Sequence, residues 1–328
     1  GPVDVAGSEY LALTLPVRSG AVFAGSPSPT ATVDGITYTI QGTKIFISAG
    51  DHDLCDNIIH PVLARIEGAP AGTRGISLFL VPKYLVNEDG SLGEFNNVVC
   101  TGLEEKMGIH GSPTCTLVFG QNDNCEGYLL GEEGEGMKLM FHMMNAARIE
   151  VGLQGCAAAG AAHQAALAYA HERLQSRHWK EMKNPEAPQV PIIQHPDVRR
   201  MLLSMKTYVE GMRSLLYYAG YLEDIMELTD DPDEKAKYQG MIDLLIPICK
   251  GYVTDRSFDV CSLGMQVYGG YGYIKEYPQE QLLRDCRITM IYEGTNGIQS
   301  MDLTMRKILM NKDQFNYNTW KSRVSDTL

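Results

Sequence analysis

The hydrophobic pattern of the chain changes abruptly near residue 135, and this change constrains the fold more than any other feature. Before it, stretches such as ITYTIQGTKIFISA and GISLFLVPKYLV alternate or cluster β-branched residues between glycine and proline, which is typical of strands. After GEEGEG, long stretches of helical character cover residues 137–177, 198–228 and 234–268. Strands followed by helices indicate the α+β class, with a β-rich domain before a helical bundle.

Three segments are expected along the chain. They are a β-rich domain over residues 1–135, a helical domain over 136–312 and a tail over 313–328. The Gly- and Ala-rich half of the first helix lets neighbouring helices approach closely, as in a tightly packed bundle. Residues 11–34 are unusually rich in Ser, Pro and Ala, which would fit a reading-frame error in the gene model.

Charge and composition exclude several classes of partner. The net charge is −12 and the isoelectric point is about 5.1, so neither nucleic acid nor an anionic membrane surface is expected as a partner. No apolar stretch is long enough to span a bilayer, and the first ten residues lack the layout of a signal peptide. The eight cysteines are scattered without a CxxC pair, which predicts reduced thiols inside a cell.

A cluster of potential metal ligands lies in DHDLCDNIIH, residues 51–60. It contains His52, Asp53, Cys55, Asp56 and His60. Their spacing matches no standard set of zinc ligands, so a polar loop between two strands is favoured and no metal is expected.

The stretch ITMIYEGTNGIQ, residues 288–299, places a single carboxylate, Glu293, between an apolar run and a glycine. Burial among apolar neighbours would disfavour the charged form and raise the pKa, which suits a base that removes a weakly acidic proton. The alternative is an ordinary acid at a helix start, with Asn296 as the cap of the following helix. Taken alone, these residues favour the helix start.

Four separated patches change that balance. They are TKIFIS (43–48), MNAARIEVGLQG (144–155), MQVYGGYGYIKEYPQEQLLRDCRI (265–288) and IYEGTNGIQ (291–299). Their order and wording resemble the acyl-CoA dehydrogenase family of flavoenzymes over about residues 35–312. The wording is most similar to the longer branch of that family, which includes the 3-methylmercaptopropionyl-CoA dehydrogenases.

The resemblance implies a barrel-like β-domain, a helical bundle and a homodimer or homotetramer. It also implies FAD as cofactor, an acyl-CoA substrate that undergoes α,β-dehydrogenation, and an electron-transfer flavoprotein as electron acceptor. The cytoplasm is the expected location, or the mitochondrial matrix in a eukaryote.

The resemblance also assigns roles to individual residues. Glu293 matches the catalytic base that removes the α-proton while the β-hydride leaves to flavin N5. Tyr292 would pack beside the acyl chain, and Asn145 and Arg148 fall where the family binds CoA. Arginine suits this role because its guanidinium donates two hydrogen bonds to one phosphate. Residue chemistry alone would leave Arg148 paired along its helix or with solvent.

The remaining matches concern the cofactor. Phe46 would lie against the isoalloxazine, and the Ser48 hydroxyl would reach its N5/O4 edge. Glycines let the main chain approach a phosphate, which suits the QxxGG patch at the diphosphate end of FAD in a neighbouring protomer. The full expected set of cofactor-binding residues is Thr14, Phe46, Ile47, Ser48, Arg173, Gln266, Gly269, Gly270 and Thr295.

The chain departs from the family pattern in two respects. It is expected to lack the N-terminal helical domain and the extra C-terminal helices, and TLPVRSG replaces the usual TEPxAGSD stretch. A non-catalytic truncated homologue or partner subunit with weak or no flavin binding therefore remains the alternative to an active dehydrogenase. An acyl-CoA oxidase is a third possibility, which would require oxygen to reach the flavin.

Overall fold

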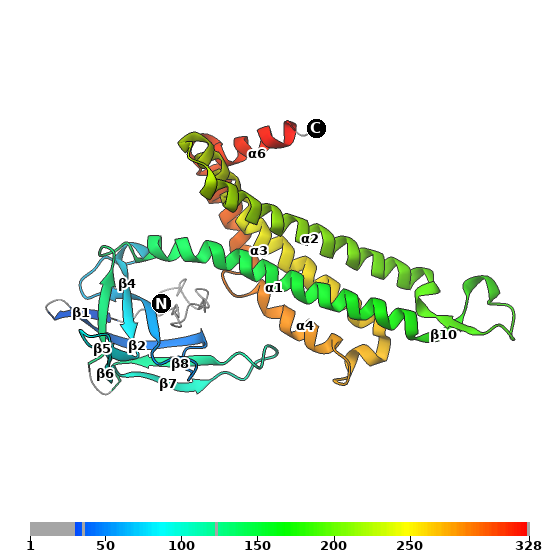
Figure 1. Ribbon diagram of the computed structural model, residues 1–328, viewed down its shortest axis with the longest axis horizontal. Helices are drawn as coiled ribbons and strands as arrows, with labels where there is room; N and C mark the ends of the chain where they lie inside the picture. Colours follow the sequence, from blue (N-terminus) through cyan, green and yellow to red (C-terminus); the bar gives the residue numbers. More distant parts are fainter. Residues whose placement is uncertain (1–29, 35–36, 122–123, 327–328) are drawn as a thin grey trace. The chain divides into compact units, whose positions relative to one another are not determined.

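The computed structural model describes residues 30–34, 37–121 and 124–326 (Figure 1). Thr14, expected to bind the cofactor, lies outside this part of the chain. The described residues form two compact units. The β unit comprises the residues up to Ala147 together with Tyr292–Gly294, and the helical unit comprises Arg148–Ile291 and the residues from Thr295 onward. Within the described ranges, no helix is both long and apolar enough to cross a bilayer.

The β unit contains one long strand, β2, and several shorter strands. Its strands are β1 (Thr30–Asp34), β2 (Thr37–Ser48), β3 (Ile59–Ile66), β4 (Ile76–Pro82), β5 (Tyr84–Val86), β6 (Leu92–Phe95), β7 (Val98–Leu103), β8 (Thr114–Phe119) and β9 (Glu126–Leu130). Seven of them form one sheet in the order β1-β3-β4-β9-β2-β8-β7, and β1 also pairs with β2. This additional pairing closes β1, β3, β4, β9 and β2 into a ring, as in a barrel. The barrel-like β-domain is thereby confirmed.

The long strand β2 is irregular where the TKIFIS motif lies. Lys44 pairs with Leu117 of β8 and Ile47 pairs with Cys115, so three residue steps on β2 match two on β8. The extra residue is a β-bulge, which bends a strand and redirects a side chain. Phe46 has φ 61° within this bulge, and its ring is 40 % exposed, whereas Ile47 is fully buried.

His60 on β3 is buried in the core of the β unit, where its ring contacts the edge of Phe119 at 6.0 Å between centroids. Neither ring nitrogen has a hydrogen-bond partner in the described structure. Burial lowers the pKa of His60 from 6.5 to about 4; the nearby Asp51 raises this pKa to a smaller extent, and Lys83 and His52 lower it further. The neutral ring is therefore the form that the folded β unit accommodates.

This burial predicts a loss of stability in mild acid. Between pH 6.5 and about 4 the unfolded chain binds a proton at His60 that the folded chain does not, so stability falls as the pH falls through this window. From pH 7 to pH 5 the expected loss is roughly 2 kcal/mol. His60→Leu should abolish this component in urea unfolding at the two pH values, whereas the exposed control His142→Leu should retain it. An unchanged pH dependence in His60→Leu would refute the assignment.

The helical unit is built from long helices with short connections. Its elements are the second part of α1 (Gly136–Glu172), then β10 (Leu174–Arg177), β11 (Gln189–Pro191), α2 (Pro196–Leu228), α3 (Pro232–Tyr268), α4 (Gln279–Arg287), α5 (Asn296–Met301), the π-helical segment η6 (Asp302–Leu309) and α6 (Phe315–Ser325). In this unit, α1, α2 and α3 run alongside one another (Figure 1). The strand-to-helix order confirms the α+β class.

Small residues set the spacing of the bundle, as the sequence predicts. Ala159, Ala162, Ala166 and Ala170 recur every three or four residues on α1 and are fully buried. At Gly152, an added Cβ would lie 2.4 Å from the carbonyl oxygen of Cys249 on α3. Only glycine therefore permits this approach of the two helices.

The first long helix is shorter than predicted. Helical character was expected to continue to residue 177, but α1 ends at Glu172 and Leu174–Arg177 forms β10. The reason is a pairing with a distant segment, since β10 forms an antiparallel ladder with β11. The predicted loop before residue 196 therefore contributes a strand.

Candidate active site

Glu293 lies in a turn between η5 (Ile288–Met290) and α5. Its side chain is 2 % exposed, so the carboxylate is buried. Glu293 has φ 57° and Gly294 has φ 82°. A residue with a Cβ rarely occupies this left-handed region, which costs about 1–3 kcal/mol and persists where the surroundings impose it, often at functional sites. The turn that carries Glu293 is therefore held by its neighbours.

The helix that follows begins at Asn296, and its cap is Thr295. The Thr295 hydroxyl accepts a hydrogen bond from the N–H of Ile298 at 3.4 Å. The alternative that made Asn296 the cap of this helix is therefore wrong, and Glu293 lies two residues before the actual cap.

Asn296 binds α3 instead of capping its own helix. Its Oδ1 accepts a hydrogen bond from Nζ of Lys250 at 2.9 Å. Its Nδ2 donates to Oδ1 of Asp255 at 2.7 Å and to the carbonyl oxygen of Gly251 at 3.1 Å. Three residues after Glu293, the chain is thus attached to the bundle by a half-buried side chain.

Arg148, expected to bind CoA, forms an ion pair inside the helical unit. It is 3 % exposed, and its Nη1 lies 2.9 Å from Oδ2 of Asp302, which is 4 % exposed. Arg306 lies on the outer side, 3.6 Å from Oδ1 of Asp302. Nε of Arg148 is buried without a hydrogen-bond partner among the described residues. Part of the guanidinium is therefore committed to the fold, and its unpartnered Nε is buried.

A pocket of about 620 Å³ lies in the helical unit, where the ends of α1 and α3 meet the start of α2. It brings together the expected diphosphate-binding residues Arg173, Gln266, Gly269 and Gly270. The guanidinium of Arg173 lies 5.3 Å from the ring centroid of Tyr271. Residues separated by more than ninety positions thus line one pocket, and this lining is called the QxxGG wall below.

The chemistry of this wall fits a nucleotide diphosphate. Arg173 supplies a cation with several N–H donors, and Gln266 supplies an amide, both exposed. An added Cβ at Gly269 or Gly270 would meet nothing within 4 Å, so the main chain faces open space there. The volume suits part of a dinucleotide. These residues therefore fit the diphosphate end of FAD.

The other expected cofactor contacts lie elsewhere. In the β unit, Phe46 is exposed and Ser48 is half-buried at the end of β2. The Ile47 side chain is fully buried in the core, so only its main chain would be available to a cofactor. In the helical unit, the Thr295 hydroxyl already serves as the cap of α5.

The two remaining substrate residues are partly exposed. Asn145 lies on α1 and is half-buried, and Tyr292 is half-buried directly before Glu293. Both side chains are therefore accessible to a ligand in part, as substrate contacts require.

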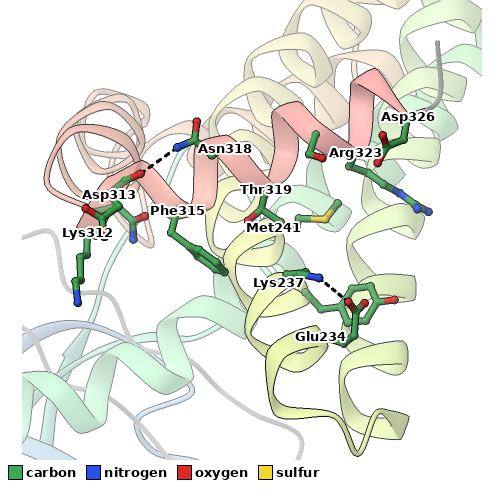
Figure 2. A pocket seen from close by; sticks show the side chains of 13 residues that line it. Glu234, Lys237, Met241, Lys312, Asp313, Phe315, Asn318, Thr319, Arg323 and Asp326 are labelled. Carbon is green, nitrogen blue, oxygen red and sulfur yellow. Dashed lines mark hydrogen bonds and ion pairs between the residues drawn. The ribbon is translucent and has the colours of Figure 1, made fainter.

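A larger pocket, of about 830 Å³, contains none of the expected site residues (Figure 2). It lies between the start of α3 and α6, where Lys237 pairs with Glu234 at 2.6 Å. Nδ2 of Asn318 donates to the main-chain oxygen of Asp313 at 3.0 Å across another part of its lining (Figure 2). The volume of a pocket therefore does not identify the candidate site. The residues expected to bind the cofactor diphosphate line the smaller pocket instead.

The polar segment at residues 51–58 is a loop between β2 and β3, with His60 inside β3. Among the described residues, no group of three or more His, Cys, Asp or Glu side chains could hold a metal ion. All eight cysteines are free thiols.

Sequence reasoning missed two buried lysines. Lys250 is fully buried on α3, and its only sequence signal is a single charge inside the apolar run LLIPICKGYV. Lys44 is 1 % exposed on β2, two residues before Phe46, and burial lowers the pKa of its ammonium to about 7. A charged residue at an inward position of an alternating strand or an apolar helix is the signal that could have identified both.

Comparison with known proteins agrees with these features. Residues 134–308 match the family model for the acyl-CoA dehydrogenase C-terminal domain. The chain is 49% identical over 277 residues to the 3-methylmercaptopropionyl-CoA dehydrogenase of Ruegeria pomeroyi, covering 84% of this chain and 46% of that relative. It is 46% identical over 294 residues to a butyryl-CoA dehydrogenase of Syntrophomonas wolfei, covering 88% and 48%. The chain spans about half the length of these relatives.

A third relative and two solved structures extend the comparison. The CarC subunit of the caffeyl-CoA reductase–Etf complex of Acetobacterium woodii is 30% identical over 297 residues, covering 90% of this chain and 68% of that protein. The butyryl-CoA dehydrogenase of Megasphaera elsdenii has a TM-score of 0.67 and 29% identity, covering 87% and 67%. An acyl-CoA dehydrogenase from Bacillus anthracis complexed with FAD has a TM-score of 0.67 and 26% identity, covering 84% and 44%.

The matched region covers more than half of the chain and contains the QxxGG wall, the Glu293 turn and the Arg148 ion pair. The resemblance that rested on four short patches is thereby confirmed over residues 134–308. The chain belongs to the acyl-CoA dehydrogenase family.

Proposed function

We propose that this chain carries out the FAD-dependent α,β-dehydrogenation of an acyl-CoA thioester, with Glu293 as the base. The observation that carries the proposal is the buried carboxylate of Glu293 in a left-handed turn, in a chain of the acyl-CoA dehydrogenase family. A buried carboxylate is a stronger base than a solvated one, because water no longer stabilises its charge.

In the proposed reaction, an Oε of Glu293 takes the proton from the α-carbon of the thioester. The N–H of Glu293 would donate to the thioester carbonyl and stabilise charge that develops there. When bound, FAD would supply the acceptor for the hydride from the β-carbon, so that two electrons leave the substrate as its double bond forms. Arg173, Gln266 and the two glycines would hold the diphosphate, and Phe46 and Ser48 the flavin ring.

The substrate and partners follow from the same assignment. Asn145 and Arg148 would bind CoA, and Tyr292 would contact the acyl chain. Short acyl groups are proposed because similar relatives are named for butyryl-CoA and 3-methylmercaptopropionyl-CoA. An electron-transfer flavoprotein is the proposed acceptor, since one relative belongs to a complex with Etf. The QxxGG wall would bind the cofactor of a second protomer, which implies a homodimer or homotetramer.

The visible absorption spectrum of the purified chain tests this proposal. After incubation with FAD and removal of the excess, the chain should retain a flavin spectrum, and anaerobic butyryl-CoA should bleach it. Acetyl-CoA is the matched control, because it has no β-carbon from which a hydride can leave. A chain that remains colourless with added FAD, or that holds FAD and is not bleached by any short acyl-CoA, would overturn the proposal.

A further inference from the structure

The ammonium group of Lys250 lies wholly inside the helical unit, at 0 % exposure on α3. Removing a charge from water costs several kcal/mol unless polar partners compensate it. One such partner is Oδ1 of Asn296, which accepts from Nζ of Lys250 at 2.9 Å. The buried ammonium of Lys250 is thus hydrogen-bonded to the first residue of α5.

The amide of Asn296 is fixed from several sides. Its Oδ1 also lies 3.3 Å from Oγ1 of Thr254, and its Nδ2 donates to Asp255 and to the carbonyl oxygen of Gly251. These contacts attach the start of α5 to residues 250–255 of α3.

The turn that carries Glu293 is attached at both ends within the helical unit. Before it, the buried Thr289 hydroxyl donates to the carbonyl oxygen of Cys286 at 2.7 Å. After it, Asn296 stands three residues from Glu293, so their Cα atoms are at most about 11 Å apart. The left-handed conformation of Glu293 needs such restraints, because it is unfavourable for a residue with a Cβ.

We propose that Lys250 is a positioning residue for the catalytic carboxylate, because through Asn296 it fixes the C-terminal end of the turn that carries Glu293. The inference rests on the proposed function for its catalytic consequence, whereas the attachment itself does not depend on any activity. A misplacement of about 1 Å of a reacting group can slow a reaction by about 100-fold.

Hydrogen exchange tests the attachment in the full chain without any ligand. Lys250→Met removes the ammonium but keeps an unbranched apolar side chain of similar length. We expect amide hydrogen exchange in the peptide 291–299 to become at least tenfold faster, with little change in α3. Ser257→Ala is the matched control, because Ser257 is also fully buried on α3 but, among the described residues, its hydroxyl bonds within its own helix and to Met212. Unchanged exchange in Lys250→Met would overturn the proposal, and Asn296→Ser serves as second variant if Lys250→Met does not fold.

Anaerobic bleaching then tests the catalytic consequence. In Lys250→Met loaded with FAD, bleaching by butyryl-CoA should be about 10- to 100-fold slower, while bleaching by dithionite and FAD content stay unchanged. Bleaching at the wild-type rate would overturn the positioning role and leave the proposed function intact. A wild-type chain that is not bleached would instead overturn the proposed function, and with it the catalytic part of this inference.

Discussion

Replacing Glu293 with glutamine is expected to slow the dehydrogenation of butyryl-CoA by about 10²–10⁴-fold or more, while FAD content and folding remain unchanged. Glutamine has the same shape as glutamate but cannot accept a proton from the α-carbon at neutral pH. Its main-chain N–H remains, so any stabilisation of the thioester carbonyl by this group should persist. The measurement is the rate of anaerobic bleaching of the bound flavin by butyryl-CoA.

The control for this substitution is Glu150→Gln, which removes an exposed carboxylate from α1 within the MNAARIE patch. It should bleach at the wild-type rate, because a solvated carboxylate on the helix surface has no part in the proposed reaction. Dithionite should bleach the flavin equally in the wild type, in Glu293→Gln and in Glu150→Gln. Equal rates with butyryl-CoA in Glu293→Gln and wild type would remove Glu293 from its proposed role.

The backbone of Glu293 explains why this substitution is cleaner than a truncation. The residue has φ 57° and precedes Gly294 at φ 82°, so the turn stores conformational strain. Glutamine keeps the same Cβ and the same strain, whereas glycine would relieve the strain and change the turn. A loss of rate in Glu293→Gln therefore reports on the carboxylate rather than on the backbone.

Hydrophobic periodicity was sufficient to predict the class of the fold. Strands and helices bury apolar residues with different periods, and the change of period coincides with the start of α1 at Gly136. The alanines of α1 likewise predicted close helix packing, which Gly152 and its approach to Cys249 confirm. These features depend on residues near one another in the sequence, and this is why a single sequence reveals them.

Features that depend on distant segments were not predictable in the same way. The helix pattern continues past Glu172, but β10 forms because Gln189–Pro191 pairs with it. The left-handed φ of Phe46 follows from a bulge whose register is set by β8. Only the three-dimensional structure brings Lys250 to Asn296, since no local pattern connects the two residues.

In the candidate site, too, the residues that lie close together in the sequence were predicted, and the contacts between distant segments were not. Short motifs singled out Glu293 and the QxxGG wall, because a family resemblance preserves residues that are close in sequence. Partners that come from distant elements were not predicted. Residue chemistry alone left Arg148 paired along its own helix or with solvent, and this is wrong, because Arg148 pairs with Asp302, 154 residues later in the chain.

The Arg148–Asp302 ion pair leads to the second large prediction. Arg148→Met should destabilise the helical unit by about 3–5 kcal/mol, because it leaves the buried carboxylate of Asp302 without its principal partner. Arg306 lies 3.6 Å from the other oxygen of Asp302 and is 56% exposed, so it compensates the charge only in part. The loss should therefore fall toward the lower end of this range. Urea unfolding at pH 7 measures it.

Two controls separate loss of a charge partner from loss of packing. Arg200→Met breaks an exposed ion pair with Asp197 in the same unit and should cost at most about 1 kcal/mol. Arg148→Met combined with Asp302→Leu removes both buried charges and should recover much of the lost stability, since an apolar pair of similar volume can replace a buried ion pair. If Arg148→Met unfolds at the wild-type urea concentration but binds acyl-CoA more weakly, Arg148 serves the substrate and the ion pair contributes little to the fold.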